Sequence, residues 1–496
     1  PRELSEEEIW ELIKAYGEAA MRAAKAGYSV VEIHGGMGYL PAQFLSPRTN
    51  KRRDSWGGEL KNRARFLLEV LSEVRRRSNL PVTVRYSLLD FLEDGVRLEE
   101  SLKVLRWIEE CGAAGISIVF GWHESPVPLI SREVQPGGFA KYCKKAKEAV
   151  EIPVIYATRV VDLSVAEWII QEGYADMVAM GRALIADPML PLKQREGKPY
   201  RPCIACNRCL SNIFSGRHVS CTVNPSLLQP AIPERFRGEL KVAVVGGGPA
   251  GMEAARVLAL RGYWVTLYEK HEELGGMLRY AAMEPYGAEF RRLIEYYRAE
   301  LERLGVDIVL NKEVGPNDVK DYDVIILAIG PSLDLSWAPE GVPVTPWWKA
   351  FEEPPEKSAT IIGSNVIGLG VADFLSSKGV NVTVVDEAKR PGRGLERVIR
   401  WIVLGRLKRA GVKFYMKSRI VKWSDGMAFI CSGEGDLHEV DAEKVYGAIR
   451  LKPAKLDEEW KKIDRKVIVI GNALYPSPDA MLLQAIHSAY HTTMKL

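Results

Sequence analysis

The sequence predicts an α/β protein: a partial (β/α)8 TIM barrel of about five strands, followed by two Rossmann-like domains. Three observations predict this organisation. Short apolar strands alternate with helical segments over the first two hundred residues, which favours a parallel sheet. Further along, two apolar strands each run into a glycine-rich turn and then a helix. Four closely spaced cysteines separate the two kinds of segment.

Composition sets broad limits on the function. The chain has 496 residues, 47% hydrophobic and 27% charged, which is enough for two or three domains with their own cores. A net charge of +4 is small for this length and gives no support to binding of nucleic acid or an anionic membrane. No apolar run approaches the roughly 18 residues of a membrane span, and no signal peptide is recognised. Seven cysteines, four of them in one motif, suggest a reducing, cytoplasmic location without a disulfide framework.

Residues 1–200 are expected to form the C-terminal part of the barrel. A capping box of Ser5 and Glu8 predicts a helix that ends near Gly27. Five strands are predicted, at residues 30–33, 82–86, 116–120, 154–156 and 177–179. Because an eight-stranded barrel takes about 250 residues, we expect the remaining strands to come from a second chain, unless this chain is itself a fragment.

Polar and aromatic side chains follow these strands at their carboxyl ends, where such barrels place their chemistry. In chain order they are His34 and Tyr39, Arg85, Trp122-His123-Glu124, Thr158 and Arg159, and Gly181 and Arg182. Arg182 follows a glycine at a predicted helix start, which suits an anion such as a phosphate. Arg85 could place positive charge beside a flavin, although an arginine at such a position is structural about as often.

The four cysteines predict a metal centre in residues 201–238. Cys203, Cys206 and Cys209 follow one another with two residues between neighbours, and Cys221 comes later. A continuous run of this kind is typical of iron–sulfur ligation, whereas structural zinc sites usually pair two separated knuckles. We therefore expect a 4Fe–4S cluster, with zinc as the main alternative and unliganded surface thiols as the plainest one.

A linker at 225–238 leads into the first Rossmann-like domain, assigned to residues 239–355 and 455–496. Its apolar strand, residues 241–245, enters the turn that contains Gly246, Gly248 and Gly251. Glu269 ends the next strand, where an acid would accept a ribose hydroxyl from a dinucleotide. Gly276 and Asn472 stand at further positions that suit FAD, although Asn472 replaces an expected aspartate. These features predict an FAD site.

A second domain of the same type is expected as an insertion at residues 356–454. Its turn carries Gly363 and Gly368, and Asp386 stands where an acid would hold a ribose. These residues predict an NAD(P)H site. Asn365 replaces the glycine that lets the backbone approach a pyrophosphate, so it should weaken or reshape binding. A degenerate domain kept for packing is the alternative, and Lys389 and Arg390 leave a choice of NADP open.

The first domain resembles a known family. Residues 32–40 (EIHGGMGYL), 43–47 (QFLSP), 50–52 (NKR), 57–58 (GG) and 62–63 (NR) are similar to the FMN barrels of the old yellow enzyme type. With the cysteine motif and the later domains, the whole chain resembles the three-cofactor branch that includes 2,4-dienoyl-CoA reductase and trimethylamine dehydrogenase. The resemblance implies FMN, with part of its site on the three barrel strands that this chain does not encode.

The resemblance also implies roles for three barrel residues. Tyr39 matches the tyrosine that gives a proton to the substrate carbon, and His123 matches the histidine that assists it. The alternative for Tyr39 is a core tyrosine. His34 matches the first member of a pair that binds a carbonyl oxygen, but the second member is Met37, whose thioether cannot donate a hydrogen bond.

Together these features predict an oxidoreductase that passes electrons from NAD(P)H through FAD and the 4Fe–4S cluster to FMN. The expected substrate is a small molecule with an activated C=C bond, such as a dienoyl-CoA or an enoate. Two alternatives stay open: oxidation of an amine or another substrate in the reverse direction, and an electron-transfer subunit of a larger complex. An oligomer is expected.

Overall fold

The computed structural model describes residues 2–127, 129–229, 240–456, 458–476 and 481–496. The predicted linker at 225–238 lies outside the described residues from position 230 onward. The chain divides into two compact units, one up to Ala183 and one from Leu184. Residues 184–200, which the sequence assigned to the barrel, are therefore grouped with the second unit. In the described part of the chain, no helix is long and apolar enough to cross a membrane.

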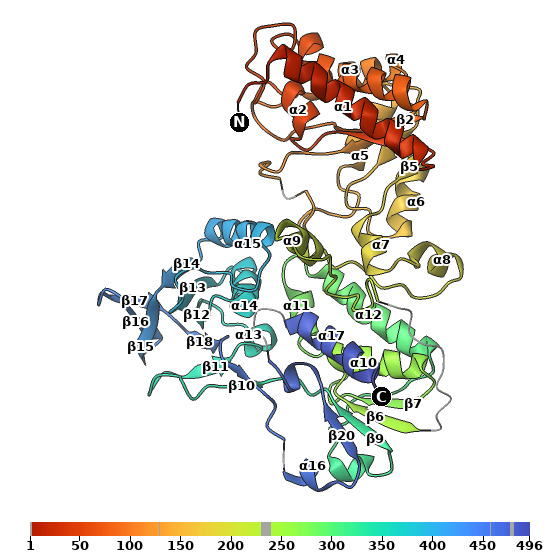
Figure 1. The fold of residues 1–496 in the computed structure, drawn as a ribbon. Helices are drawn as coiled ribbons and strands as arrows, with labels where there is room; N and C mark the ends of the chain where they lie inside the picture. The colour runs from red at the N-terminus through yellow and green to blue at the C-terminus, as the bar shows by residue number, and fades with distance from the viewer. Residues whose placement is uncertain (1, 128, 230–239, 457, 477–480) are drawn as a thin grey trace. The chain divides into compact units, whose positions relative to one another are not determined.

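The first unit is a five-stranded parallel sheet in chain order, β1-β2-β3-β4-β5, with helices between its strands (Figure 1). The strands are β1 (Val31–Gly35), β2 (Val82–Ser87), β3 (Gly115–Val119), β4 (Val154–Tyr156) and β5 (Met177–Val178). The helices are α1 (Glu6–Lys25), α2 (Leu40–Leu45), α3 (Leu60–Ser78), α4 (Leu98–Glu110), α5 (Ala140–Lys147) and α6 (Leu163–Gln171). The five predicted strands are confirmed, with ends that differ by at most two residues.

The first helix begins as the sequence predicts. The Ser5 hydroxyl accepts a hydrogen bond from the Glu8 backbone N–H at 3.2 Å, and the Glu8 carboxylate accepts one from the Ser5 N–H at 2.8 Å. This reciprocal pair satisfies two donors that a helix start otherwise leaves without partners. Ile9 and Ile13 of α1 are buried in the core that also holds Phe66 of α3. Helices α1 and α3 therefore share one hydrophobic core with the strands of the sheet.

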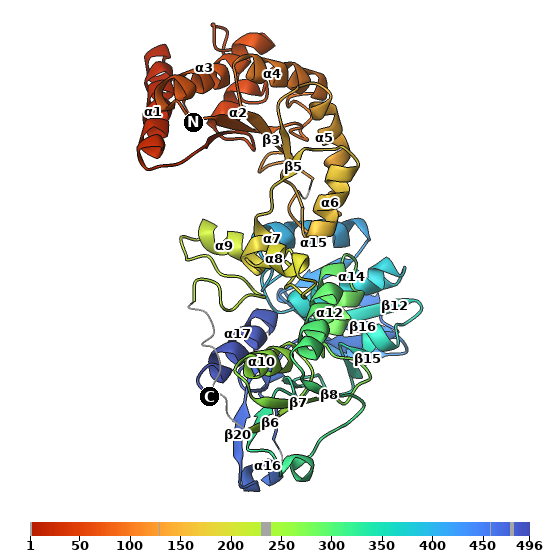
Figure 2. The same cartoon turned by 90° about the vertical axis from the view of Figure 1, so that its right-hand side faces the viewer.

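The second unit contains two separate parallel sheets of five strands each (Figures 1 and 2). The first has the order β20-β9-β6-β7-β8 and the second β11-β18-β12-β13-β14. The members of the first sheet are β6 (Lys241–Val245), β7 (Trp264–Tyr268), β8 (Asp307–Val309), β9 (Val324–Leu327) and β20 (Lys466–Val469). The members of the second are β11 (Val344–Pro346), β12 (Ser358–Ile362), β13 (Asn381–Asp386), β14 (Lys413–Met416) and β18 (Lys444–Gly447). The chain thus leaves the first sheet after β9 and returns to it with β20.

Smaller strands and the remaining helices complete this unit. An antiparallel sheet joins β15 (Ser418–Ser424), β16 (Met427–Ser432) and β17 (Leu437–Asp441), and β10 (Ser332–Leu333) pairs with β19 (Leu451–Lys452). The helices are α7 (Arg182–Ala186), which begins in the first unit, α8 (Leu190–Arg195), α9 (Arg208–Phe214), α10 (Pro249–Leu260), α11 (Leu278–Met283), α12 (Ala288–Arg303), α13 (Lys349–Glu352), α14 (Val366–Ser377), α15 (Arg397–Arg409), α16 (Glu458–Lys462) and α17 (Met481–Thr493). Two short 3-10 helices are η1 (Pro316–Val319) and η2 (Gly471–Ala473). Helices α10 and α17 lie side by side in both views.

Each parallel sheet of this unit holds one of the predicted glycine-rich turns. Gly246 and Gly363 begin the two turns with φ of +106° and +115°, a region that favours glycine. A methyl group on Gly251 would overlap the Gly246 carbonyl oxygen, and one on Gly368 would overlap that of Gly363. Both glycines are therefore needed for the close packing of a helix on the strand that precedes it.

This packing predicts opposite changes in the free energy of unfolding for glycine-to-alanine substitutions at two positions. Gly251→Ala should lower the free energy of unfolding by about 3 kcal/mol, because the new methyl group meets backbone that cannot move aside. Gly405→Ala, in helix α15, meets no atom closer than 3.5 Å and should raise stability by about 1 kcal/mol through its higher helix propensity. Calorimetric unfolding of both variants tests the pair, and a stable Gly251→Ala variant would contradict the packing argument.

Candidate functional site

Three of the predicted barrel residues lie together at the carboxyl edge of the first sheet. The Tyr39 hydroxyl lies 3.3 Å from Nε2 of His123, and their rings meet edge to face with centroids 5.5 Å apart. The His34 ring lies 4.8 Å from the Tyr39 ring, centroid to centroid. Tyr39 is 47% exposed, so it is not a core tyrosine. A phenol that is open to solvent and touches an imidazole can donate a proton to a bound substrate.

Hydrogen bonds from strand β2 hold the two loops that carry this pair. The Ser87 hydroxyl accepts the Met37 backbone N–H at 2.8 Å and lies 3.2 Å from the Gly121 carbonyl oxygen, to which it donates. Met37 and Trp122 also form an isolated parallel bridge, and Met37 has φ of +57°. Sequence reasoning missed Ser87. The only sequence feature that could have indicated a role for Ser87 was its position at the end of a predicted strand.

Burial and nearby charges favour the neutral form of the His34 imidazole. Burial lowers the pKa of His34, and the nearby Arg85 guanidinium lowers it further, while Glu32 acts in the opposite direction. Arg85 forms an ion pair with Glu32, with Nε and Oε1 2.9 Å apart. The Arg85 charge is therefore partly balanced within the site. His34 Nδ1 is buried and has no hydrogen-bond partner among the described residues, so it is placed to meet a ligand.

The other residues predicted to contact FMN lie on later strand ends. Thr158 and Arg159 are buried after β4. Arg159 has φ of +54°, and its Nε donates to the Val134 carbonyl at 2.9 Å, so part of its role is to hold the loop after β3. Gly181 is exposed, and nothing lies within 4 Å of a methyl group built on it. Arg182 begins α7, and its role toward a phosphate stays a prediction.

The cysteine segment in the second unit contains two left-handed residues. Ala205 and Asn207, which lie between the first three cysteines, have φ of +49° and +56°. Left-handed residues are one component of the backbone turns that bind iron–sulfur sites. Burial, together with the nearby Cys206 and Cys203, raises the pKa of the Cys221 thiol to about 12.

The surroundings of the cysteines are also ordered. The Cys206 sulfur lies 3.3 Å from the Thr222 hydroxyl, and Cys209 is buried in α9. Nε2 of His487, from helix α17, lies 2.8 Å from the Cys221 carbonyl oxygen. Among the described residues, no three His, Cys, Asp or Glu side chains are arranged to hold a single metal ion. A 4Fe–4S cluster binds one cysteine thiolate at each of its four irons. The four sulfur atoms therefore need not surround a single metal ion.

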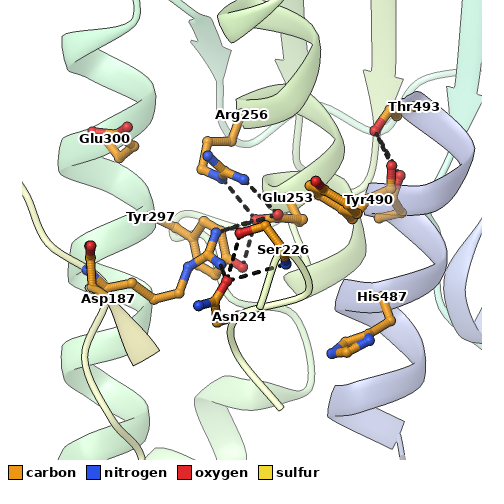
Figure 3. A network of polar contacts seen from close by, with 12 residues as sticks. Asp187, Asn224, Ser226, Glu253, Arg256, Tyr297, Glu300, His487, Tyr490 and Thr493 are labelled. Carbon is orange, nitrogen blue, oxygen red and sulfur yellow. Dashed lines mark hydrogen bonds and ion pairs between the residues drawn. The ribbon is translucent and has the colours of Figure 1, made fainter. Parts of the chain in front are cut away.

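A buried ionic network ties this segment to helices α10 and α12 (Figure 3). The Arg201 guanidinium donates to the Glu253 carboxylate at 3.1 Å and to the Asn224 side-chain oxygen at 3.5 Å. Arg256 donates to both oxygens of Glu253, at 2.9 and 2.7 Å, and the Tyr297 hydroxyl donates to one of them at 3.0 Å. Sequence reasoning missed this network, because no local pattern relates residues so far apart in the chain.

The turn after β6 leaves a helix start open, as a pyrophosphate requires. Gly248 is the N-cap of α10, and no side chain caps the helix there. The Glu269 carboxylate accepts the Gly247 N–H at 2.8 Å and the His271 N–H at 3.0 Å, which fixes it beside the turn. Gly276 packs against Gly248, since a methyl group on it would lie 3.0 Å from the Gly248 Cα. The backbone N–H groups at the start of α10 therefore have no side-chain cap, as a site for a dinucleotide pyrophosphate requires.

Asn472 lies in η2, next to the start of helix α17. Its side-chain nitrogen donates to the Met481 carbonyl at 2.9 Å, which joins η2 to the start of α17. Its side-chain oxygen is buried and has no hydrogen-bond partner among the described residues. The neighbouring Gly471 N–H donates to the Ser488 hydroxyl at 3.0 Å. An orphaned buried acceptor at this position suits a donor group on a bound cofactor.

The turn after β12 has Asn365 at the N-cap position, where the first turn has Gly248. The Asn365 side-chain oxygen accepts the N–H groups of Ile367 and Gly368 at 3.0 and 3.1 Å, and its nitrogen donates to the Ala448 carbonyl at 2.8 Å. Asn365 thus occupies the helix donors that a pyrophosphate would use. Asp386 is held by the N–H and the hydroxyl of Ser364, at 2.6 and 2.7 Å.

Comparison with known proteins identifies both halves of the chain. Residues 1–200 match the model of the NADH:flavin oxidoreductase / NADH oxidase family. Residues 240–470 match the model of the pyridine nucleotide-disulphide oxidoreductases. These matches bear out the α/β barrel and dinucleotide-binding domains, and they support flavin and NAD(P)H as cofactors.

Three known proteins are similar over most of their length. A metal reductase of Desulforamulus reducens is 33% identical over all of this chain and 80% of its own. A cinnamate reductase of Clostridium sporogenes is 36% identical over 78% of this chain and 62% of its own. The structure of a 2-naphthoyl-CoA reductase in complex with 2-naphthoyl-CoA has a TM-score of 0.93 and 32% identity, over all of this chain and 77% of that one. The chain belongs to the NADH:flavin oxidoreductase / NADH oxidase family and is an NAD(P)H-dependent flavin oxidoreductase.

Proposed function

We propose that this protein passes electrons from NAD(P)H through FAD and a 4Fe–4S cluster to FMN and reduces an activated C=C bond. The observation that carries the proposal is the contact between the Tyr39 hydroxyl and His123, 3.3 Å apart at a sheet edge. The names of two similar proteins, the cinnamate reductase and the 2-naphthoyl-CoA reductase, point in the same direction. The substrate class is an unsaturated acyl-CoA or an enoate.

In this proposal Tyr39 delivers the proton. Reduction of a C=C bond adds a hydride to one carbon and a proton to the other, and a reduced flavin supplies the hydride when bound. Tyr39 is exposed, so a substrate can reach it, and His123 replaces its proton through their contact. His34 is neutral, so it can hydrogen-bond an uncharged group on the substrate or flavin without adding charge.

The cysteine segment supports a 4Fe–4S cluster on Cys203, Cys206, Cys209 and Cys221. Thiolates are soft ligands that suit iron–sulfur clusters, and the left-handed residues Ala205 and Asn207 turn the backbone between the first three cysteines. A cluster of this kind carries single electrons, so it connects two flavins that each exchange two. The FAD domain lies in the same unit, with its open helix start at Gly248.

FMN belongs to the first unit. The sheet offers Arg85, Thr158, Arg159, Gly181 and Arg182 at its strand ends. Within the described residues, β1 and β5 each pair with a single neighbour, so the sheet has two open edges. We infer that further strands, from a second chain or from another part of the same polypeptide, close the barrel and complete the FMN site.

Cofactor analysis tests the core of this proposal. The purified protein should contain about four irons per chain and FAD, as the four thiols and the open turn require. Metal analysis, the visible spectrum and identification of any copurified chain give the answer. Zinc in place of iron, or a protein that binds no flavin, would contradict the proposal.

Removal of the Tyr39 hydroxyl should separate the two half-reactions. Tyr39→Phe should leave reduction of flavin by NAD(P)H unchanged but slow oxidation of the reduced protein by substrate by about 10²–10⁴-fold, the usual contribution of a general acid. Rapid-mixing absorbance spectroscopy measures each half separately. Tyr28→Phe is a matched control, because Tyr28 is 65% exposed and lies outside the site. Equal rates in the Tyr39 and Tyr28 variants would remove Tyr39 from the mechanism.

Asn365 should limit the affinity for the nicotinamide dinucleotide. Asn365→Gly frees the N–H groups of Ile367 and Gly368, so the Kd for NAD(P)H should fall about tenfold, since one hydrogen bond to a charged group contributes about 1.5–3 kcal/mol. The same variant should lose about 1 kcal/mol of stability with the bond to Ala448. Equilibrium titration with NAD(P)H measures the change.

Asn311→Gly is the matched control for this substitution. Asn311 lies after β8 with φ of +56°, which glycine adopts without strain, so neither affinity nor stability should change much. An unchanged or weaker affinity in the Asn365 variant would mean that this turn does not receive the pyrophosphate.

A further inference from the structure

The ionic network beside the cysteine segment carries a net charge. Glu253 has no exposed surface, and Arg201 and Arg256 are 5% and 7% exposed. Burial by itself raises the pKa of Glu253, but Arg201 and Arg256 outweigh it and hold the pKa below its usual value, so the carboxyl group is ionised. Two guanidinium groups and one carboxylate leave one positive charge in the protein interior (Figure 3).

Nearby ionised groups do not cancel this charge. Asp187 accepts the Arg201 backbone N–H at 2.9 Å, but it is paired with Lys193 at 2.6 Å. Glu300 on α12 is paired with Arg303 at 2.7 Å. Each of these pairs is neutral, so the net charge of the network stays positive.

The network meets the cysteine segment at both of its ends. Arg201 stands two residues before Cys203, and Asn224, its hydrogen-bond partner, stands three residues after Cys221. The Arg201 guanidinium bonds both Asn224 and Glu253, so the chain on either side of the cysteines is joined directly to the buried carboxylate. The buried charge therefore lies beside the segment that carries the four cysteines.

We propose that the buried positive charge of the Arg201–Glu253–Arg256 network raises the reduction potential of the cluster held by the four cysteines. This inference rests on the proposed function. Reduction adds one electron to the cluster, so its charge falls by one unit while no bond forms or breaks. A positive charge nearby stabilises the reduced form, and in the protein interior this effect is screened little by salt. The three residues are positioning residues that act through the field.

Substitutions of opposite charge test this in the holoenzyme. Arg201→Met removes a positive charge and should lower the ratio of reduced to oxidised cluster at a fixed potential by about tenfold, which is about 59 mV for a one-electron couple. Glu253→Gln removes a negative charge and should raise that ratio by a similar factor. Arg201→Lys keeps the charge and is the matched control, for which the ratio should stay near that of the unaltered protein. Potentiometric titration followed by the spin resonance signal of the reduced cluster measures all three.

The opposite signs separate charge from damage. Loss of packing alone would shift the potentials of the Arg201→Met and Glu253→Gln variants in the same direction, and that result, or no shift in either, would overturn the proposal. If the Arg201→Met variant loses iron, Arg256→Met replaces it as the test. Arg256→Met also removes one positive charge, and within the network the Arg256 side chain bonds only Glu253. This variant must lower the reduction potential of the cluster. A protein without iron would overturn the proposed function, whereas four irons with unmoved potentials would overturn this inference alone.

Discussion

The Glu253 carboxylate is the constraint on which the second unit depends. It has no exposed surface, and it accepts hydrogen bonds from Arg201 before the cysteines, Arg256 on its own helix and Tyr297 on α12. A buried ionic group of this kind adds little net stability, because desolvation offsets the attraction between the charges. What it does impose is geometry: an unpaired buried charge is so costly that the three segments have one favourable arrangement. The glycine turn at the start of α10 and the cysteine segment are thereby held in a fixed relation.

The two glycine-rich turns show how the residue at the N-cap changes the hydrogen bonds that one local fold can offer. Both place a glycine with positive φ after a strand and pack a second glycine on its carbonyl oxygen. At the N-cap the first turn has Gly248, which leaves the helix donors open, while the second has Asn365, which satisfies them internally. A pyrophosphate at the second turn must therefore compete with an intramolecular acceptor, and binding there has a cost that binding at the first turn lacks.

Sequence patterns identified the parts of this protein whose cause is local. The Ser5 capping box, the five strands of the first sheet and both turns follow from periodicity, capping chemistry and the conformational freedom of glycine. The contacts of Ser87 with Met37 and Gly121, and those of Glu253 with Arg201 and Tyr297, could not be predicted. They join residues 34 to 52 positions apart, and only the register of the sheet or the packing of helices brings such residues together. The capping role of Asn365 lies between these cases: its N-cap preference is local, but its bond to Ala448 spans 83 positions.

The proposed proton and electron functions rest on separate sets of contacts. The contact of Tyr39 with His123 and the bonds of Ser87 to the loops that carry them lie within the first unit. The bonds of Glu253, Asn365 and Glu269 all lie within the second. Substitutions in one set should therefore act additively with those in the other, because residues that share no partner couple weakly.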